Sequence, residues 1–295
     1  MAAELVQVSE LTYYLPGPTQ VGLVRLGGDE VCLIDSGGDK SAGRALRRLI
    51  EQRGWRLRAI FNTHSHADHI GGNQYLQART GCRIYAPGIE SAFTRYPSLE
   101  PLFLYGGNPG RALRSKFLQA AESAAEPLCP EDLPEGFRAI PLPGHSFDMV
   151  GYLTPDGVFF AADALAAPET LAKHRVWFLC DPAAHLHTLR QLPQIEARLV
   201  IPSHAAPAAD IRELARLNQE AVHSVADTIC AICRAGALTH EDITARMAGE
   251  LGLQLSPEQH ALLGCTLRSY LSWLRDSGKL CAAIVDNRLI WNAEA

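Results

Sequence analysis

The sequence predicts an α/β domain followed by a mainly helical C-terminal region. Up to about residue 207, short apolar runs of strand length alternate with turn residues and with segments of helical spacing. From about Ala208 the pattern changes to long helical segments. A chain of 295 residues is long for one domain, and 47% of its residues are hydrophobic, enough for a large core. We therefore predict a first domain over residues 1–210 and an appendage over residues 211–295.

The N-terminal third is predicted to consist mainly of strands. Four short apolar runs indicate them, at residues 5–8, 12–15, 21–26 and 31–34. The residues Gly27-Gly28-Asp29-Glu30 are typical of a hairpin turn between the last two. Helical spacing then predicts a helix over residues 41–53, and the apolar run at 57–61 predicts a short buried strand.

A second group of strands is predicted further along the chain, at residues 137–142, 151–154, 158–162 and 199–201. The C-terminal region should hold helices over residues 211–235, 243–251 and 257–277, and a hairpin over residues 280–291. Helices followed by a hairpin resemble a winged-helix module. Residues 212–295 hold eight Lys/Arg and ten Asp/Glu, whereas a DNA reader normally has a basic face. We therefore expect a packing role or a homodimer contact for this region, without nucleic acid.

Three imidazoles and one carboxylate follow the strand at 57–61 within six consecutive positions: His64, His66, Asp68 and His69. A loop behind a buried strand presents side chains from a rigid scaffold. In extended backbone His64 and His66 point the same way, and Asp68 continues the alternation. Neutral imidazole and carboxylate are ligands for zinc, and also for iron, manganese and nickel. The loop therefore predicts a metal site, and it could supply two neighbouring pockets.

The pattern His64-x-His66-x-Asp68-His69 resembles the signature of the metallo-β-lactamase superfamily, in its glyoxalase-II-like branch. This resemblance implies an αββα sandwich and three further ligands, each at a strand end. The sequence offers a candidate for each in the right order: His145, Asp163 and His204.

The resemblance also implies two divalent ions, with zinc as the first choice and iron or manganese as alternatives. One ion would be held by His64, His66 and His145. The second would be held by Asp68, His69 and His204. In this arrangement Asp163 bridges the two ions.

The reaction implied by this resemblance is hydrolysis of a thioester, ester or related acyl bond in a small-molecule substrate by a metal-activated hydroxide. Asp68 would be a ligand and would also orient or deprotonate the nucleophile. The alternatives are a nuclease of the same fold, a mono-iron sulfur dioxygenase and a non-enzymatic metal-binding module. The residues after His145 and His204 differ from those of typical glyoxalase II, which weakens the case for hydroxyacylglutathione as the substrate.

Other candidate residues lie outside the ligand set. Asp35 is either a turn and cap residue or, by the resemblance, a residue that orients a ligand histidine. Residues 87–136 are rich in Pro, Gly and aromatic residues, which predicts an insertion that shapes the substrate site as a lid, with a helix over residues 111–125. Four residues are candidate substrate contacts: Tyr105, Asn108, Lys173 and His174.

Some reactive side chains are assigned ordinary roles. His185 and His187 lie on a predicted helix without complementary ligands, so we expect them at the surface. Cys230 and Cys233 lie in a helical pattern without a second Cys-x-x-Cys, which favours buried packing.

The composition limits the partners and the compartment. A net charge of −5 and a pI near 6.1 give no general attraction to nucleic acid or to anionic membranes. The N-terminus does not resemble a signal peptide, and no apolar run reaches the length of a membrane span. Eight scattered cysteines form no disulfide framework, so we expect a reducing cytoplasm.

Overall fold

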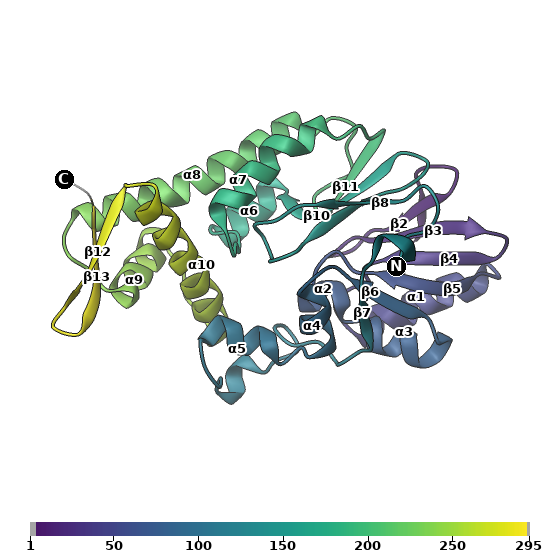
Figure 1. Cartoon of the computed structure of the whole chain (residues 1–295), viewed down its shortest axis with the longest axis horizontal. Helices are drawn as coiled ribbons and strands as arrows, with labels where there is room; N and C mark the ends of the chain where they lie inside the picture. The colour runs from purple at the N-terminus through teal and green to yellow at the C-terminus, as the bar shows by residue number, and fades with distance from the viewer. Residues whose placement is uncertain (1–3, 294–295) are drawn as a thin grey trace.

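The computed structural model describes residues 4–293, and two β-sheets pack face to face in its larger part (Figure 1). The predicted domain limits at residues 1 and 295 lie outside the described residues. The first sheet has seven strands in sequence order, antiparallel up to β4 and parallel from β4 to β7. Its strands are β1 (Val6–Gln7), β2 (Thr12–Leu15), β3 (Val21–Gly27), β4 (Glu30–Ile34), β5 (Arg56–Phe61), β6 (Arg83–Ala86) and β7 (Ala125–Pro127).

The second sheet has four strands in the order β11-β10-β9-β8. They are β8 (Arg138–Pro141), β9 (Val150–Leu153), β10 (Val158–Ala166) and β11 (Leu199–His204). Strands β10 and β11 are parallel, and the chain between them forms α6 (Pro168–His174), α7 (Pro182–Gln191) and the 3-10 turn η3 (Leu192–Gln194). All nine residues of β10 are buried, so this strand lies at the centre of its sheet between two apolar layers.

The alternation of side chains along β4 shows how the layers are made. Val31 and Leu33 pack toward α1 (Lys40–Gln52) and α3 (Asn73–Thr80), which cover the outer face of the first sheet. Cys32 and Ile34 point the other way and pack against the second sheet. Helix α7 and α8 (Arg212–Arg234) cover the outer face of that second sheet. The result is the four-layer αββα sandwich that the sequence predicts.

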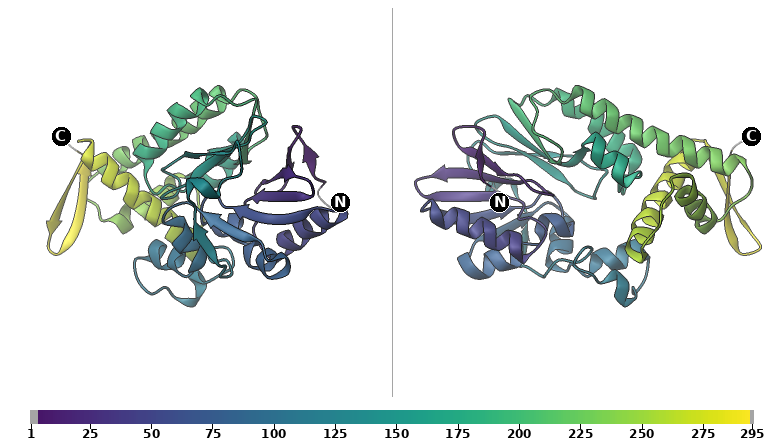
Figure 2. Two further views of the ribbon diagram at one scale, coloured as in Figure 1. Left: turned by 45° about the vertical axis from the view of Figure 1, so that its right-hand side comes forward. Right: turned by 180° about the vertical axis from the view of Figure 1, so that it is seen from behind.

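The C-terminal region is helical and ends in a small sheet. Helix α8 has 23 residues and is therefore about 34 Å long, and the rear view shows it running from the sandwich to the C-terminal strands (Figure 2). It is followed by α9 (His240–Glu250), α10 (Pro257–Asp276) and the hairpin of β12 (Leu280–Val285) and β13 (Arg288–Ala293). Cys230 and Cys233 are buried in the core of this region.

The segment 87–136 differs from the prediction in two ways. It contains α4 (Glu90–Arg95), α5 (Leu99–Tyr105), two short 3-10 turns, η1 (Arg111–Leu113) and η2 (Pro130–Asp132), and strand β7, which pairs with β6. Part of the segment therefore belongs to the sheet rather than forming an insertion. The helix predicted over residues 111–125 is wrong, because only the η1 turn forms. Leu113 and Leu118, five positions apart, both reach one apolar cluster, a spacing that one face of an α-helix does not provide.

Candidate metal centre

The loop between β5 and α2 (Ala67–Ile70) is fixed from behind by Asp35, which follows β4. Asp35 is buried and lies in the left-handed region at φ 62°. Its carboxylate accepts hydrogen bonds from the N–H and the hydroxyl of Thr63, both at 2.8 Å. Nδ1 of His69 lies 2.7 Å from Oδ2 of Asp35. This contact turns Nε2 of His69 toward the other histidines, so Asp35 has the geometry of a residue that orients a ligand.

Three imidazoles converge on one side of the loop. Nδ1 of His66 lies 3.0 Å from Nε2 of His64 and 3.0 Å from Nε2 of His145. His145 comes from the turn after β8, in the second sheet. Burial lowers the pKa of His64 and of His145 well below the ordinary value, and the nearby imidazoles add to this effect. Neutral rings with lone pairs facing one point are the form that binds a divalent metal.

Two histidines and a carboxylate converge on the other side. Oδ2 of Asp68 lies 3.6 Å from Nε2 of His69 and 3.3 Å from Nε2 of His204, which is the last residue of β11. Nδ1 of His204 is 2.8 Å from the carbonyl oxygen of Pro18, which fixes the orientation of the ring. Asp68 also accepts a hydrogen bond of 2.7 Å from the hydroxyl of Thr19.

Asp163 lies between the two groups. One carboxylate oxygen is 3.1 Å from Nε2 of His69, and the other is 3.3 Å from Nε2 of His145 and 3.2 Å from Nε2 of His204. The pairing of β10 with β11 is irregular at Ala162, whose φ is +50°. Such an irregularity redirects the next side chain. This is the physical reason why a carboxylate on a fully buried strand reaches the ends of both sheets.

The chemistry of these side chains fits divalent cations. The structure holds three groups of three such side chains, and within each group the ligand atoms lie within 4.8 Å of one another. Two of these groups are His64/His66/His145 and Asp68/His69/His204. Nε2 of His69 and Oδ1 of Asp163 are buried and lie 3.1 Å apart without hydrogen-bond geometry, and neither has another hydrogen-bond partner among the described residues. Burial disfavours charge on His204, but Asp163 and Asp68 outweigh it and raise its pKa to about 10. This side of the cluster therefore attracts positive charge, which a divalent ion would supply.

A comparison with protein families decides the classification. The family model described as the metallo-β-lactamase superfamily matches residues 14–204. The chain belongs to the metallo-β-lactamase superfamily. The matched residues include all seven side chains of the cluster.

Relatives and solved structures agree with this membership. Hydroxyacylglutathione hydrolases of Brucella ovis and Brucella suis are 28% identical over 235 residues, which cover 73% of this chain and 80% of each relative. A β-lactamase domain protein from Burkholderia ambifaria superposes with a TM-score of 0.75 at 18% identity, over 99% of this chain and 94% of that chain. A metallo-β-lactamase family protein from Thermus thermophilus gives a TM-score of 0.70 at 21% identity, over 99% of each chain. The structural likenesses establish the fold, and the superfamily with its hydrolase relatives supports a metal-dependent hydrolase.

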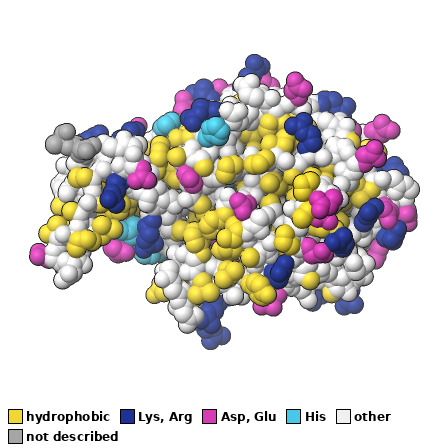
Figure 3. Space-filling model, in the orientation of Figure 1, with side chains coloured by type: hydrophobic (Ala, Val, Ile, Leu, Met, Phe, Trp, Pro, Cys, Tyr) yellow, Lys and Arg dark blue, Asp and Glu magenta, His cyan; other side chains and the backbone are white. Residues whose placement is uncertain are grey.

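Two aromatic rings that the sequence did not single out cover the cluster from the segment after α6. The ring centroid of Phe178 lies 5.3 Å from that of His66 and 5.8 Å from that of His145. The ring of Trp177 lies 5.5 Å from His145 and 5.7 Å from His204. Figure 3 shows hydrophobic side chains gathered near the middle of one face of the molecule. The centre therefore has an apolar wall on one side.

Two buried carboxylates also escaped the sequence interpretation. Glu100, on α5, has an oxygen 3.8 Å from Nε2 of His66, the ring nitrogen that faces away from His64 and His145. Glu90, on α4, accepts hydrogen bonds from two loops, one carrying His64 and His66 and the other carrying His145. The available signal was only their position in the segment between the first two ligand clusters.

The four predicted substrate contacts take different places. His174 lies 6.0 Å from the ring of Trp177, at the edge of the apolar wall, and Lys173 beside it is exposed. Tyr105 is exposed at the end of α5, and Asn108 accepts a hydrogen bond from Arg114. Among the described residues, no hydrogen bond or ring contact joins Tyr105 or Asn108 to the cluster.

The prediction for His185 is wrong, because its side chain is buried and only His187 is exposed. His185 lies directly behind the turn that carries His145. A Cβ on Gly144 would meet the backbone nitrogen of His185 at 2.3 Å. Burial lowers the pKa of His185 to about 4, so its ring is neutral at pH 7.

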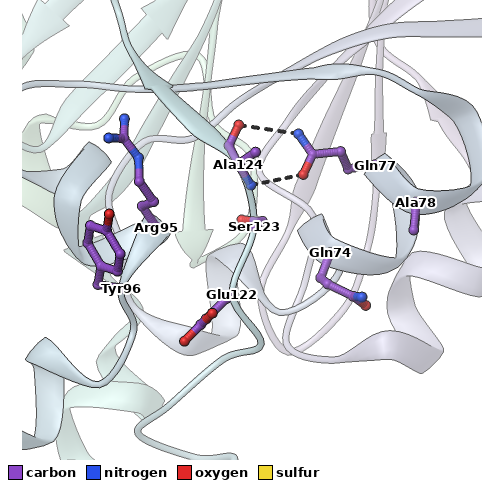
Figure 4. A pocket seen from close by; sticks show the side chains of 8 residues that line it. All are labelled: Gln74, Gln77, Ala78, Arg95, Tyr96, Glu122, Ser123 and Ala124. Carbon is purple, nitrogen blue, oxygen red and sulfur yellow. Dashed lines mark hydrogen bonds between the residues drawn. The ribbon is translucent and has the colours of Figure 1, made fainter.

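A shallow surface hollow of about 400 Å³ lies apart from this centre (Figure 4). Gln77 and Arg95 are among its lining residues. Gln77 exchanges two hydrogen bonds with the backbone of Ala124, and Arg95 donates to the carbonyl oxygen of Ala125. Two of its polar side chains thus already bind the protein, and none of the seven cluster residues lines it.

Proposed function

We propose that this chain is a binuclear metal-dependent hydrolase, with zinc as the native metal, that cleaves thioesters, esters or related acyl bonds. The observation that carries the proposal is the convergence of seven ligand-type side chains from both sheets. His64, His66 and His145 would hold one ion. Asp68, His69 and His204 would hold the other, with Asp163 between them and Asp35 orienting His69. Bound divalent ions lower the pKa of water and polarise a carbonyl oxygen.

Asp68 is the residue that we propose for the proton transfer. Its side chain is 47% exposed, compared with 17% for His66 and 16% for His204, so water and substrate can reach it. The hydroxyl of Thr19 holds one carboxylate oxygen. Proximity to His69 and hydrogen bonding to His204 lower the pKa of Asp68. The carboxylate is therefore ionised at neutral pH and can orient a water molecule and accept its proton.

The apolar wall suggests how a substrate lies. Trp177 and Phe178 would exclude water behind the reacting carbonyl group, and His174 and Lys173 at the edge of the wall would meet polar or anionic parts of the substrate. For Tyr105 and Asn108, a substrate contact stays a prediction. The catalytic unit is proposed to end near residue 210, with residues 211–295 as an appendage that packs on it and could join two copies.

No helix among residues 4–293 is long and apolar enough to cross a membrane.

Metal content and a substrate panel together test the proposed function. Elemental analysis of the purified protein is expected to find two zinc ions per chain, whereas one iron per chain would favour the dioxygenase alternative. The panel would compare thioesters, esters, lactones and phosphodiesters at one metal concentration. We expect metal-dependent cleavage of acyl substrates. Cleavage of the phosphodiesters alone would refute the acyl assignment.

A further inference from the structure

Glu90 is a fully buried carboxylate at the start of α4, and its hydrogen bonds all lead to the metal-binding loops. One oxygen accepts from the N–H of Ser65, at 3.0 Å, and from its hydroxyl. The other oxygen accepts from the hydroxyl of Ser146 and from the N–H of Asp148, at 3.1 Å. Among the described residues no Lys or Arg forms an ion pair with it. Its charge is therefore stabilised by these four donors.

The donors belong to two loops from different sheets. Ser65 lies between His64 and His66 in the loop after β5. Ser146 directly follows His145 in the turn before β9. The two oxygens of one carboxylate thus join the loop that carries two ligands of the first triad to the loop that carries the third.

A second hydrogen bond joins the start of α4 to the loop after His145, and here the loop supplies the acceptor. Oδ2 of Asp148 accepts a hydrogen bond of 2.8 Å from the N–H of Ile89, next to Glu90. Gly88 allows this approach, because a Cβ at that position would lie 2.0 Å from Oδ2 of Asp148. These hydrogen bonds give Ser146 and Asp148, which follow His145, a structural role in this chain.

We propose that Glu90 is a positioning residue that sets the geometry of the His64/His66/His145 metal site. This inference rests on the proposed function, because it requires that a metal binds there. With the two loops joined, the three ring nitrogens are held in convergence before the metal arrives. Without Glu90, metal binding must order the loops at the cost of affinity.

Glu90→Gln is the central test, because glutamine has nearly the same shape. Its amide oxygen can still accept from Ser65, and the hydroxyl of Ser146 can turn to accept from the amide NH2. The backbone N–H of Asp148 cannot turn to become an acceptor, so it would face the NH2 group of the glutamine, which is also a donor. Loss of a residue that orients metal ligands typically weakens metal binding about 10–100-fold. We expect a loss of this size for the first site and a smaller one for the second.

The measurement is zinc affinity by competition with a chromogenic chelator, in parallel with the visible spectrum of the cobalt-substituted protein. Asp156→Asn is the matched control. The carboxylate of Asp156 also accepts several hydrogen bonds, from Leu11, Thr12 and Thr154, but it joins the two sheets away from the metal centre. The control should lower the melting temperature and leave the zinc affinity and the cobalt spectrum unchanged. Glu90→Asp, which keeps the charge, should recover part of the affinity.

The outcomes separate the two proposals. Zinc affinity in Glu90→Gln equal to wild type, or reduced only as much as in Asp156→Asn, would overturn the role of Glu90 and leave the proposed function intact. Absence of zinc binding in the wild-type protein would overturn both. If Glu90→Gln fails to fold, Ser146→Ala removes one donor and keeps the carboxylate. It should weaken the first site in the same direction, and an unchanged first site in that variant would also refute the inference.

Discussion

Asp35→Asn should impair the second metal site through the tautomer of His69. In the wild-type protein one oxygen of Asp35 accepts from the N–H of Thr63, and the other accepts from the hydroxyl of Thr63 and from Nδ1–H of His69. The proton on Nδ1 leaves the lone pair on Nε2 free for a metal. Asparagine tolerates the left-handed conformation that Asp35 adopts, so the backbone is not further strained.

The magnitude follows from the two orientations of the new amide. With its NH2 toward His69, the ring must accept on Nδ1 and carry its proton on Nε2, where a metal cannot bind. With its NH2 toward Thr63, the His69 tautomer is correct, but the buried N–H of Thr63 loses its acceptor, which costs about 1–3 kcal/mol. The metal-free protein adopts the first orientation, and metal binding must enforce the second. Affinity at the site of Asp68, His69 and His204 should therefore fall about 5–150-fold.

The assay is zinc titration resolved into two sites, together with nitrogen-detected NMR of the histidine tautomers in the metal-free protein. Burial lowers the pKa of His69, but Asp163, Asp68 and Asp35 outweigh burial and raise the pKa well above the ordinary value, so the spectra are recorded at a pH high enough for the His69 ring to be neutral. The His69 ring should change from the Nδ1–H to the Nε2–H tautomer in Asp35→Asn. The variant Asp156→Asn, which also removes a hydrogen-bonded carboxylate, should change neither measurement. Unchanged second-site affinity, or an unchanged tautomer accompanied by lost affinity, would refute this reasoning.

Three further predictions test other parts of the molecule. In Asp68→Asn, second-site occupancy should weaken, and turnover of a true substrate should stay about 10²–10⁴-fold low even when excess zinc restores both ions. Full turnover with both ions bound would reduce Asp68 to a ligand. Burial alone would raise the pKa of Asp156, but its hydrogen bonds outweigh burial and lower the pKa below 3.8. Its stabilising effect is therefore present above pH 3.8 and is lost as pH falls through the lower, folded-state pKa. The free energies of unfolding of wild type and Asp156→Asn, measured in urea, should differ at pH 7 and converge in strong acid. Leu104→Ala, in the buried contact between α5 and α10, should lower the free energy of unfolding by about 2–5 kcal/mol, and a loss below 1 kcal/mol would show that this contact contributes little.

Most strands and helices could be predicted from local patterns, whereas the αββα sandwich and the full ligand set followed from the resemblance of residues 64–69 to a family signature. His64, Asp163 and His204 follow or end apolar runs, and a sheet brings the ends of its strands together at one edge. The strands themselves have alternating or continuous apolar residues. Strand β7 was missed because three residues, one of them Pro127, carry no such pattern. The hydrogen bonds that complete this strand come from β6, 39 positions or more earlier in the chain.

Glu90 was overlooked and His185 was misjudged for a different reason. An acidic residue in a segment rich in glycine and proline looks like a solvated surface residue, and burial without a basic partner is uncommon for glutamate. Its partners are backbone and hydroxyl groups of distant loops, which leave no charge pattern in the sequence. His185 lies on an amphipathic helix whose buried face is decided by β10 and α8. The local spacing does not reveal which histidine of the pair faces inward.

The role of the C-terminal helices in the metal centre is also set by long-range packing. Phe178 contacts the rings of His66 and His145, and it also packs against the apolar cluster that joins α5 to α10. The next residue, Leu179, is buried in the core of the C-terminal region, and its N–H lies 3.4 Å from the hydroxyl of Thr266 on α10. Since α5 carries Glu100 toward His66, one helix of the appendage supports both the aromatic wall and the carboxylate. The change of sequence pattern near residue 208 does not mark where the support of the metal centre ends, because that support depends on side chains of residues 257–276.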